Sequence, residues 1–166
     1  MRIKGIILDV DGTLTDGKKY YLNTPDLTIA KSFSVRDGKG VNLAMKKGIK
    51  CCLITADPWE LITDRAKDMG ITDVFYNCHD KITAAKEFCS KYGIDLSEVC
   101  FMGDDVNDIP LMLAVGLPVA VGDALPSVKR AALSIPGGMV TNLHGGNGAV
   151  REAITVILRE YTDEKN

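Results

Sequence analysis

Short apolar runs alternate along the chain with stretches of helical period, and glycine, proline or polar residues separate them. Each apolar run has the length of a strand that is buried on both faces of a sheet. The expected strands are residues 6–8, 49–54, 73–76, 99–102, 117–121 and 133–135, and the expected helices are residues 41–47, 57–69, 81–92, 108–115, 126–132 and 148–161. This alternation predicts an α/β fold with a doubly wound parallel, Rossmann-like sheet.

The stretch between the first strand and the first helix departs from this alternation. Two β-prone runs flank the turn sequence Asn-Thr-Pro-Asp at residues 23–26, which predicts an inserted β-hairpin over about residues 18–34. The core sheet does not need this hairpin, and its tyrosine, leucine, isoleucine and phenylalanine side chains favour an assembly surface. Residues 35–40 contain two glycines and are expected to form a loop before the first helix.

Composition limits the class of protein. A chain of 166 residues with 46% hydrophobic and 25% charged residues is expected to form a single globular domain over residues 1–166. The formal net charge of −2 gives no sign of a nucleic-acid or membrane partner. The longest apolar run, residues 111–121, is too short to span a bilayer, and no signal peptide is expected before the first strand. Five cysteines without a C-x-x-C pair are expected to be reduced core residues of a cytoplasmic protein.

The first strand ends abruptly at two carboxylates. Asp9 follows the apolar run directly, and Asp11 comes two residues later, before Gly12. Open α/β sheets place their chemistry at the carboxyl ends of their strands. Because glycine permits a sharp turn, we expect the chain to leave the strand at Val10–Asp11, so that the two carboxylates take different parts in binding one ligand.

Polar side chains also follow other predicted strands. Thr55 follows the second strand, Lys81 begins the helix after the third, and Asp104 and Asp105 follow the fourth. In a doubly wound sheet these positions converge on one crevice. A carboxylate can attack phosphorus and form an aspartyl-phosphate, and two or three carboxylates suffice to bind Mg²⁺. A lysine and a hydroxyl can hold phosphoryl oxygens, so these residue types favour phosphoryl transfer.

Together these residues resemble the four motifs of the haloacid dehalogenase superfamily of phosphohydrolases. The resemblance implies that Asp9 is the catalytic nucleophile and that Asp11 is the general acid and base. It implies that Mg²⁺ is bound by the Asp9 carboxylate, the Asp11 main-chain carbonyl and the Asp104 carboxylate. Thr55 and Lys81 would hold the phosphate.

Three further acidic residues are candidates for the site, and two of them, Asp57 and Asp108, have a second interpretation. The resemblance places Asp105 and Asp108 around the metal ligands, where either could contact metal-bound water. For Asp108 a helix N-cap is an equally good interpretation. Asp57 has the form of an N-cap with Pro58 as the first helical residue and Glu60 as its reciprocal partner. A carboxylate at position 57 could equally accept hydrogen bonds from the hydroxyl groups of a sugar.

Larger superfamily members carry a cap domain, and the intervals between the motifs leave no room for one. Residues 35–40 and 145–152 are similar to segments of the 3-deoxy-D-manno-octulosonate 8-phosphate phosphatases. That family assembles as tetramers through the hairpins, and a carboxy-terminal tail reaches an adjacent active site, so the resemblance implies a homotetramer. It also makes Arg36 and Arg151 candidates to bind the carboxylate of a sugar acid, although both also fit surface positions.

The leading hypothesis is a Mg²⁺-dependent phosphatase that acts on an acidic 2-keto-3-deoxy sugar phosphate, with 3-deoxy-D-manno-octulosonate 8-phosphate favoured. Octulosonate enzymes usually carry arginine where Asp57 and Asn147 stand here, whereas nonulosonate 9-phosphate phosphatases carry an acidic residue at the first of these positions. A nonulosonate phosphatase is therefore an alternative. Another is a non-catalytic oligomerisation domain related to CMP-sialic acid synthetase. A phosphomutase is disfavoured, because it normally needs a cap.

Overall fold

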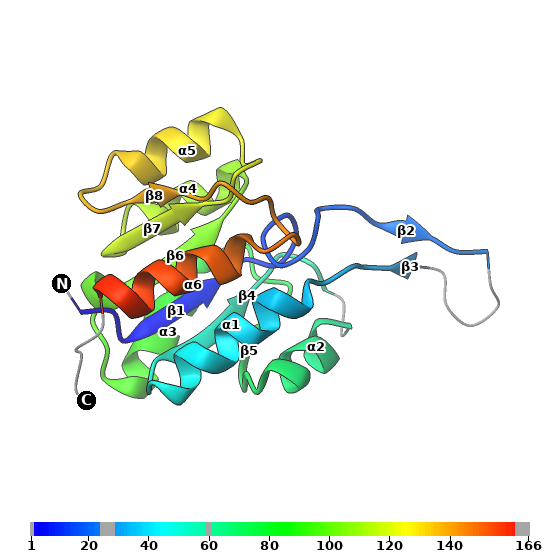
Figure 1. The fold of residues 1–166 in the computed structure, drawn as a ribbon. Coiled ribbons are helices and arrows are strands. Elements are labelled where there is room, and N and C mark those ends of the chain that lie inside the picture. Colours follow the sequence, from blue (N-terminus) through cyan, green and yellow to red (C-terminus); the bar gives the residue numbers. More distant parts are fainter. Residues whose placement is uncertain (1, 24–28, 59–60, 162–166) are drawn as a thin grey trace.

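A computed structural model describes residues 2–23, 29–58 and 61–161. Within these residues, six parallel strands form one sheet in the order β5-β4-β1-β6-β7-β8 (Figure 1). The strands are β1 Gly5–Leu8, β4 Lys50–Ile54, β5 Asp73–Phe75, β6 Val99–Gly103, β7 Leu117–Ala120 and β8 Met139–Val140. The predicted α/β fold with a doubly wound parallel sheet is confirmed.

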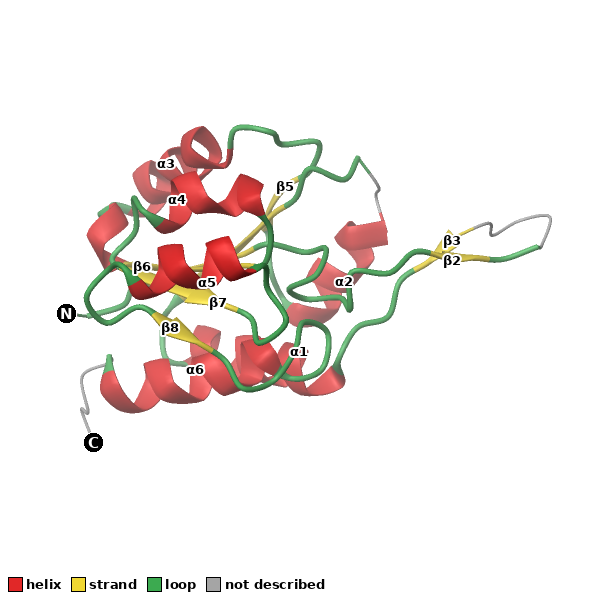
Figure 2. Ribbon diagram, turned by 90° about the horizontal axis from the view of Figure 1, so that it is seen from above, coloured by secondary structure: helices red, strands yellow, loops and turns green. Residues whose placement is uncertain are grey.

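Helices cover both faces of this sheet (Figure 2). On one face lie α1 Val35–Lys46, α2 Leu61–Met69 and α6 Ala149–Glu160, and on the other lie α3 Lys81–Tyr92, α4 Ile109–Met112 and α5 Pro126–Leu133. Two short 3₁₀ helices, η1 Leu96–Glu98 and η2 Val106–Asp108, flank β6. None of the helices described is both long enough and apolar enough to cross a membrane.

The core lies between the sheet and these helices. Ile6, Ile7 and Leu8 of the central strand are fully buried, because β4 and β6 flank β1 and helices cover both of its faces. The five cysteines are free thiols, and all except Cys78 are buried. The four buried cysteines therefore serve as small apolar side chains of the core, as expected, whereas Cys78 is only partly buried.

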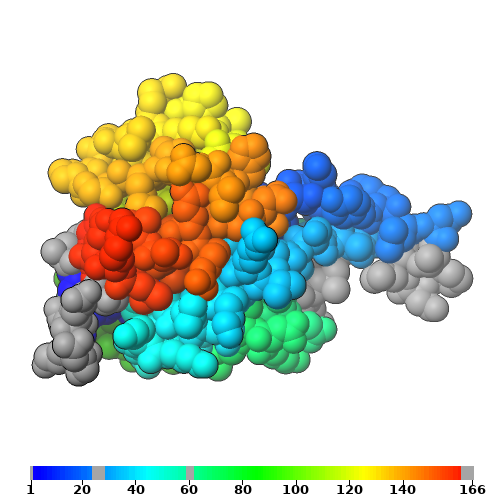
Figure 3. Space-filling view, in the orientation of Figure 1, coloured from blue at the N-terminus to red at the C-terminus, as the bar shows by residue number. Residues whose placement is uncertain are grey.

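The inserted hairpin is present between β1 and α1. Its strands, β2 Tyr20–Tyr21 and β3 Ile29–Ala30, pair antiparallel and extend away from the body of the molecule (Figures 1 and 3). Much of the predicted turn at residues 23–26 lies outside the described residues. Between β1 and α1 the described residues form this hairpin and no cap domain.

The predicted loop over residues 35–40 is wrong, because α1 begins at Val35. Ser34 is its N-cap, and the Ser34 side chain accepts a hydrogen bond from the Asp37 amide at 3.4 Å. A Cβ at Gly38 would lie 2.6 Å from an Arg65 nitrogen, and one at Gly40 would lie 3.2 Å from the Arg151 side chain. The two glycines therefore permit close packing of α1 on α2 and α6, rather than forming a loop.

The predicted strand over residues 133–135 is also wrong. Leu133 ends α5 and is 61% exposed, and the sixth strand is β8, which pairs with β7. Between them, Gly137 has a φ of +86°, and a Cβ at Gly138 would overlap the carbonyl oxygen of Ala132. A tight reversal that favours glycine thus delays the strand by several residues.

Candidate active site

The loop after β1 turns sharply at the carboxyl end of the strand. The Asp9 amide still pairs with the Met102 carbonyl at 3.0 Å. The amides of residues 13–15 then all donate to the Val10 carbonyl. Gly12 has a φ of +89°, and a Cβ there would overlap a carboxylate oxygen of Asp104. The chain therefore leaves the strand at Val10–Asp11, as predicted, and Gly12 lets the loop approach Asp104.

A segment close to the carboxy-terminal helix seats this loop. The Gly146 amide donates to the Thr13 carbonyl at 3.0 Å. A Cβ at Gly145 would overlap the Gly12 carbonyl oxygen, so the two backbones are in direct contact. The loop after the first strand is thus held by residues from the far end of the chain.

Lys81 forms two short ion pairs in the buried part of the site. Its Nζ lies 2.5 Å from Asp9 Oδ1 and 2.6 Å from Asp108 Oδ1. Lys81 is the first residue of α3, where the Asp80 side chain caps the helix and fixes its start. Burial lowers the pKa of Lys81, but the charges of Asp9 and Asp108 raise it more, so the side chain stays an ammonium ion.

Asp108 turns back toward the end of β6. Its Oδ2 accepts hydrogen bonds from the amides of Asp104 at 2.9 Å and Asp105 at 3.3 Å. Asp108 stands at the N-cap position of α4 but makes no side-chain cap bond there, so the interpretation of Asp108 as a cap of that helix is wrong. Gly103 makes the turned-back arrangement possible, because a Cβ at that position would overlap the Asp108 carboxylate.

Asp9, Asp104 and Asp108 form a cluster of carboxylates. One oxygen of each lies within 4.8 Å of the others. Asp9 Oδ2 is buried and has no hydrogen-bond partner. Burial, together with the charges of Asp108 and Asp105, raises the pKa of Asp104 to about 7, and burial also raises the pKa of Asp9. Crowded carboxylates with an unsatisfied oxygen fit a divalent cation, and Asp108 joins the predicted ligands Asp9 and Asp104 at this position.

The Asp11 side chain lies outside this cluster and is held on both of its oxygens. Thr55 Oγ1 donates to Asp11 Oδ2 at 3.3 Å, and Lys31 Nζ lies 2.5 Å from Asp11 Oδ1. Thr55 is placed by the sheet, since its amide pairs with the Phe75 carbonyl at 2.8 Å just beyond β4. Sequence reasoning missed Lys31, because a lysine in a hairpin strand resembles an ordinary exposed residue.

Asp57 also contacts the hairpin. Its Oδ2 lies 2.8 Å from Lys31 Nζ and 3.2 Å from Lys19 Nζ. These ion pairs lower its pKa even though burial acts in the opposite direction. Trp59 and Glu60 of the predicted capping segment lie outside the described residues.

Five of the predicted site residues, Asp9, Asp11, Thr55, Asp104 and Asp105, line one hollow of about 130 Å³ at the carboxyl edge of the sheet. The lining residues are Asp9, Asp11, Thr55, Ala56, Asp57, Asp104, Asp105 and Asn107. Lys81 does not line the hollow but contacts one of its lining residues, Asp9. The structure therefore brings together the residues that were predicted to converge, and it adds Asn107 and the hairpin lysines.

Arg36 and Arg151 lie elsewhere in this chain. They line a separate hollow of about 460 Å³ with Val35 and Lys39, and neither lines the hollow of Asp9. The Asp37 carboxylate explains why their two segments meet. It accepts from the Arg151 amide at 2.8 Å and from the Gly148 amide at 3.2 Å, and so caps the start of α6.

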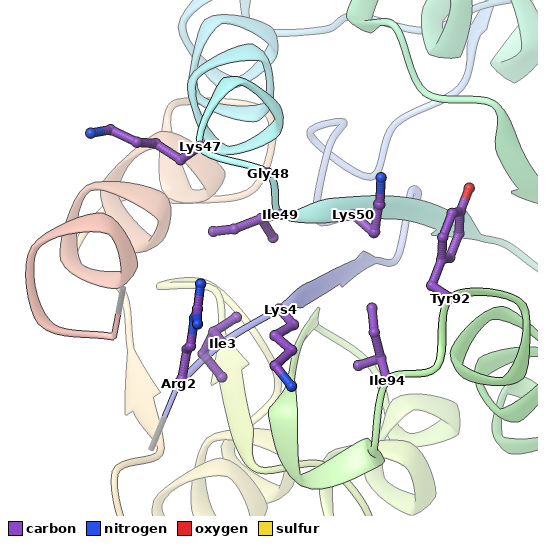
Figure 4. A pocket seen from close by; sticks show the side chains of 9 residues that line it. All are labelled: Arg2, Ile3, Lys4, Lys47, Gly48, Ile49, Lys50, Tyr92 and Ile94. Carbon is purple, nitrogen blue, oxygen red and sulfur yellow. The ribbon is translucent and has the colours of Figure 1, made fainter. Parts of the chain in front are cut away.

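A third hollow, of about 270 Å³, lies at the opposite edge of the sheet (Figure 4). Its lining residues come from the amino ends of β1 and β4 and from the end of α3: Arg2, Ile3, Lys4, Lys47, Gly48, Ile49, Lys50, Tyr92 and Ile94. None of the predicted site residues lines it. The convergent carboxylates are thus confined to the carboxyl edge, where parallel sheets place their active sites.

The family model of haloacid dehalogenase-like hydrolases matches residues 66–137. Over 156 residues the chain is 40% identical to the 3-deoxy-D-manno-octulosonate 8-phosphate phosphatase KdsC of Escherichia coli K12. The matched region covers 94% of this chain and 79% of that enzyme. The chain belongs to this phosphatase family. It is therefore a phosphatase of the haloacid dehalogenase superfamily. This membership favours an enzyme over the alternative of a non-catalytic oligomerisation domain.

Solved structures of this phosphatase family share the fold. The cobalt-bound deoxy-D-mannose-octulosonate 8-phosphate phosphatase of Haemophilus influenzae has a TM-score of 0.86 at 35% identity, over 95% of this chain and 88% of that one. The Moraxella catarrhalis enzyme, in complex with magnesium, phosphate and KDO, has a TM-score of 0.84 at 33% identity, over 95% and 86%. Both relatives bind a divalent metal, in keeping with the acidic cluster of this phosphatase.

Proposed function

We propose that this phosphatase hydrolyses 3-deoxy-D-manno-octulosonate 8-phosphate with Mg²⁺, through an aspartyl-phosphate on Asp9. The buried Asp9 carboxylate carries the proposal. Lys81 holds its Oδ1, whereas its Oδ2 has no hydrogen-bond partner and belongs to a residue that lines the hollow. An oxygen with no hydrogen bond to break is suited to attack phosphorus. The names of the related enzymes support the choice of substrate.

In the first step Asp9 Oδ2 forms a bond to phosphorus as the bond between phosphorus and the sugar oxygen breaks. Asp11 donates a proton to the leaving sugar oxygen, which would otherwise depart as a poorly stabilised alkoxide. Thr55 and the Lys81 ammonium stabilise the phosphoryl oxygens, and the position of Lys81 beside Asp9 places that charge at the reacting group.

In the second step Asp11, now a carboxylate, removes a proton from the water that attacks phosphorus. The bond between Asp9 and phosphorus breaks, and inorganic phosphate and the free Asp9 carboxylate are restored. The Asp9 and Asp104 carboxylates and the Asp11 carbonyl would hold Mg²⁺, with Asp108 and Asp105 around them. When bound, Mg²⁺ supplies positive charge that neutralises the phosphoryl group.

We also propose that the enzyme assembles as a homotetramer through its hairpins. Tyr21 is 78% exposed at the tip of β2, and Tyr20 and Leu22 beside it are 41% and 39% exposed. Apolar side chains on a short, projecting two-stranded element are costly to leave in water. In such an assembly Arg36 and Arg151 would meet the sugar carboxylate at the site of a neighbouring subunit.

A substrate comparison tests the choice of sugar. We expect kcat/KM for octulosonate 8-phosphate to exceed that for nonulosonate 9-phosphate by about 10-fold, because the related enzymes are named for the octulosonate. It should exceed that for hexose phosphates by about 10²-fold, because hexose phosphates lack the carboxylate that Arg36 and Arg151 would bind. Phosphate release with Mg²⁺ gives the rates, and a mock purification from cells that do not express the enzyme measures contaminating phosphatases. A preference for the nonulosonate would support the alternative substrate, for which the acidic Asp57 is the favouring feature.

Asp104 predicts how the stability of the metal-free protein depends on pH. Its folded-state pKa of about 7 lies above the ordinary value of 3.8, so the folded protein keeps a proton that the unfolded chain has lost. Lowering the pH from about 8 to about 6 is therefore expected to raise Tm in EDTA, and the gain is lost as the pH rises through about 7. Asp104→Asn should flatten this dependence. Equal pH slopes for the two proteins would contradict the assignment.

A further inference from the structure

Lys31 is a buried cation of the site to which the mechanism above gives no part. It follows β3 at the base of the hairpin, and its side chain is only 1% exposed. Removing an ammonium ion from water costs several kcal/mol, roughly, unless close anions offset the loss. Asp11 and Asp57 are those anions, with oxygens 2.5 and 2.8 Å from Lys31 Nζ.

These contacts belong to a closed ring of four residues. Lys31 bridges Asp11 Oδ1 and Asp57 Oδ2. The Asp57 amide donates to Thr55 Oγ1 at 3.0 Å, and Thr55 Oγ1 in turn donates to Asp11 Oδ2 at 3.3 Å. Both oxygens of Asp11 are therefore held, one from the hairpin and one from the end of β4.

The hairpin is anchored to this ring from both of its arms. Lys31 comes from the arm after β3, and Lys19, from the arm before β2, lies 3.2 Å from Asp57 Oδ2. The Asp57 carboxylate is nearly buried, with 6% of its side chain exposed. Because Asp57 follows β4, it ties the position of the hairpin to the rigid sheet.

We propose that Lys31 is a positioning residue that fixes the Asp11 carboxylate for proton transfer. The inference rests on the proposed function, in which Asp11 is the general acid and base. In the first step Asp11 carries the proton to be transferred while its Oδ1 still accepts from Lys31, and in the second step it is the carboxylate that Lys31 and Thr55 hold. In both steps the carboxyl group must face the reacting oxygen within hydrogen-bond reach, and free rotation of the side chain would reduce the fraction of time it spends there. The hairpin therefore contributes to catalysis within its own chain, in addition to any part in assembly.

Kinetics with p-nitrophenyl phosphate separate this part from a structural one. Its leaving group departs without a proton, so the first step needs no general acid, whereas the second step still needs Asp11 as a base. Lys31→Met should release about one equivalent of nitrophenol per site in a rapid burst. The steady-state kcat that follows should then fall roughly 10- to 100-fold, less than the full contribution of a general acid and base. KM should fall together with kcat, so that kcat/KM stays within about twofold of the wild-type value, because only the second step is slowed and substrate binding is not affected.

The octulosonate phosphate is the second substrate. Its poor leaving group needs the acid in the first step, so Lys31→Met should lower kcat without a burst. Asp11→Asn should likewise give a burst with p-nitrophenyl phosphate and none with the octulosonate phosphate, and it should lower kcat on each substrate more than Lys31→Met does. Lys31→Arg should recover part of the rate, because the guanidinium can still bridge two carboxylates. Lys18→Met is the matched control, since Lys18 lies on the same hairpin, is 71% exposed and pairs with Asp16.

Asp57→Asn keeps the test decisive if Lys31→Met does not fold. It weakens the anchor of Lys31 but leaves the ammonium in place, so the same burst with a smaller loss of kcat is expected. A wild-type kcat in Lys31→Met, or a raised KM with kcat unchanged, would overturn the inference, the latter in favour of substrate binding by Lys31. Failure of the proposed function is a separate result, because it would appear as full activity of Asp9→Asn.

Discussion

Asp9→Asn is expected to lower kcat for the sugar phosphate by roughly 10⁴-fold or more, as the loss of a nucleophile does in other covalent mechanisms. An amide oxygen is a poor nucleophile and cannot form the acyl phosphate. The substitution keeps the shape of the side chain in a site where Asp9 is only 5% exposed, so the fold should persist. Phosphate release under saturating Mg²⁺ gives the rate, and circular dichroism with thermal melting checks the fold.

The matched control is Asp64→Asn. Asp64 lies on α2 with 82% of its side chain exposed, and it pairs with Lys67 at 3.4 Å. An exposed pair of this kind contributes little, so the control should keep wild-type activity and stability. Undiminished turnover by Asp9→Asn would show that another group attacks phosphorus, and the aspartyl-phosphate on Asp9 would then be rejected.

Removal of divalent metal is expected to lower activity by about 10³-fold, which corresponds to several kcal/mol of lost charge stabilisation in the transition state. Readdition of Mg²⁺ should restore it. Asp104→Asn should raise the Mg²⁺ concentration for half-maximal activity by about 10²-fold or more, because even the partners around a metal ligand contribute 10- to 100-fold. The measurement is a titration of free Mg²⁺ against activity, with calorimetric binding to the same variants.

Asp105→Asn provides the comparison for Asp104→Asn. Asp105 Oδ1 accepts from the Val106 amide at 2.6 Å, and Asp105 does not belong to the cluster of carboxylates within 4.8 Å. Its substitution should change the Mg²⁺ requirement much less than that of Asp104. Full activity in EDTA, or equal shifts for the two variants, would contradict the placement of the metal.

The strands of the sheet and the convergence of the site were predictable from the sequence because they depend on local patterns. The apolar run before Asp9 indicates a buried strand, and Lys81 to Tyr92 is bounded by Asp80 and Gly93, which cap a helix at each end. Once the sheet is parallel, its topology alone brings the strand ends together. Family resemblance added residue roles, which the experiments above test.

The errors arose where tertiary packing decides the local structure. Gly38 and Gly40 have the composition of a loop, but they lie in α1, where the absence of a Cβ lets Arg65 of α2 and Arg151 of α6 pack closely against the helix. Asp108 does not cap α4, because the missing Cβ of Gly103 leaves room for its carboxylate to turn away from that helix. Lys31 could not be found from any local pattern, because its partners Asp11 and Asp57 come from two other loops.

The contact of Gly145 and Gly146 with the loop of residues 12–15 has a consequence for synthesis of the enzyme. Asp9 and Asp11 follow β1 directly, but the neighbouring strands β4 and β6 and the segment that seats the loop are translated later than β1. Contacts between such distant parts of a chain form slowly. The loop that carries Asp9 and Asp11 therefore cannot be fully held in place until residues 145 and 146 have been translated.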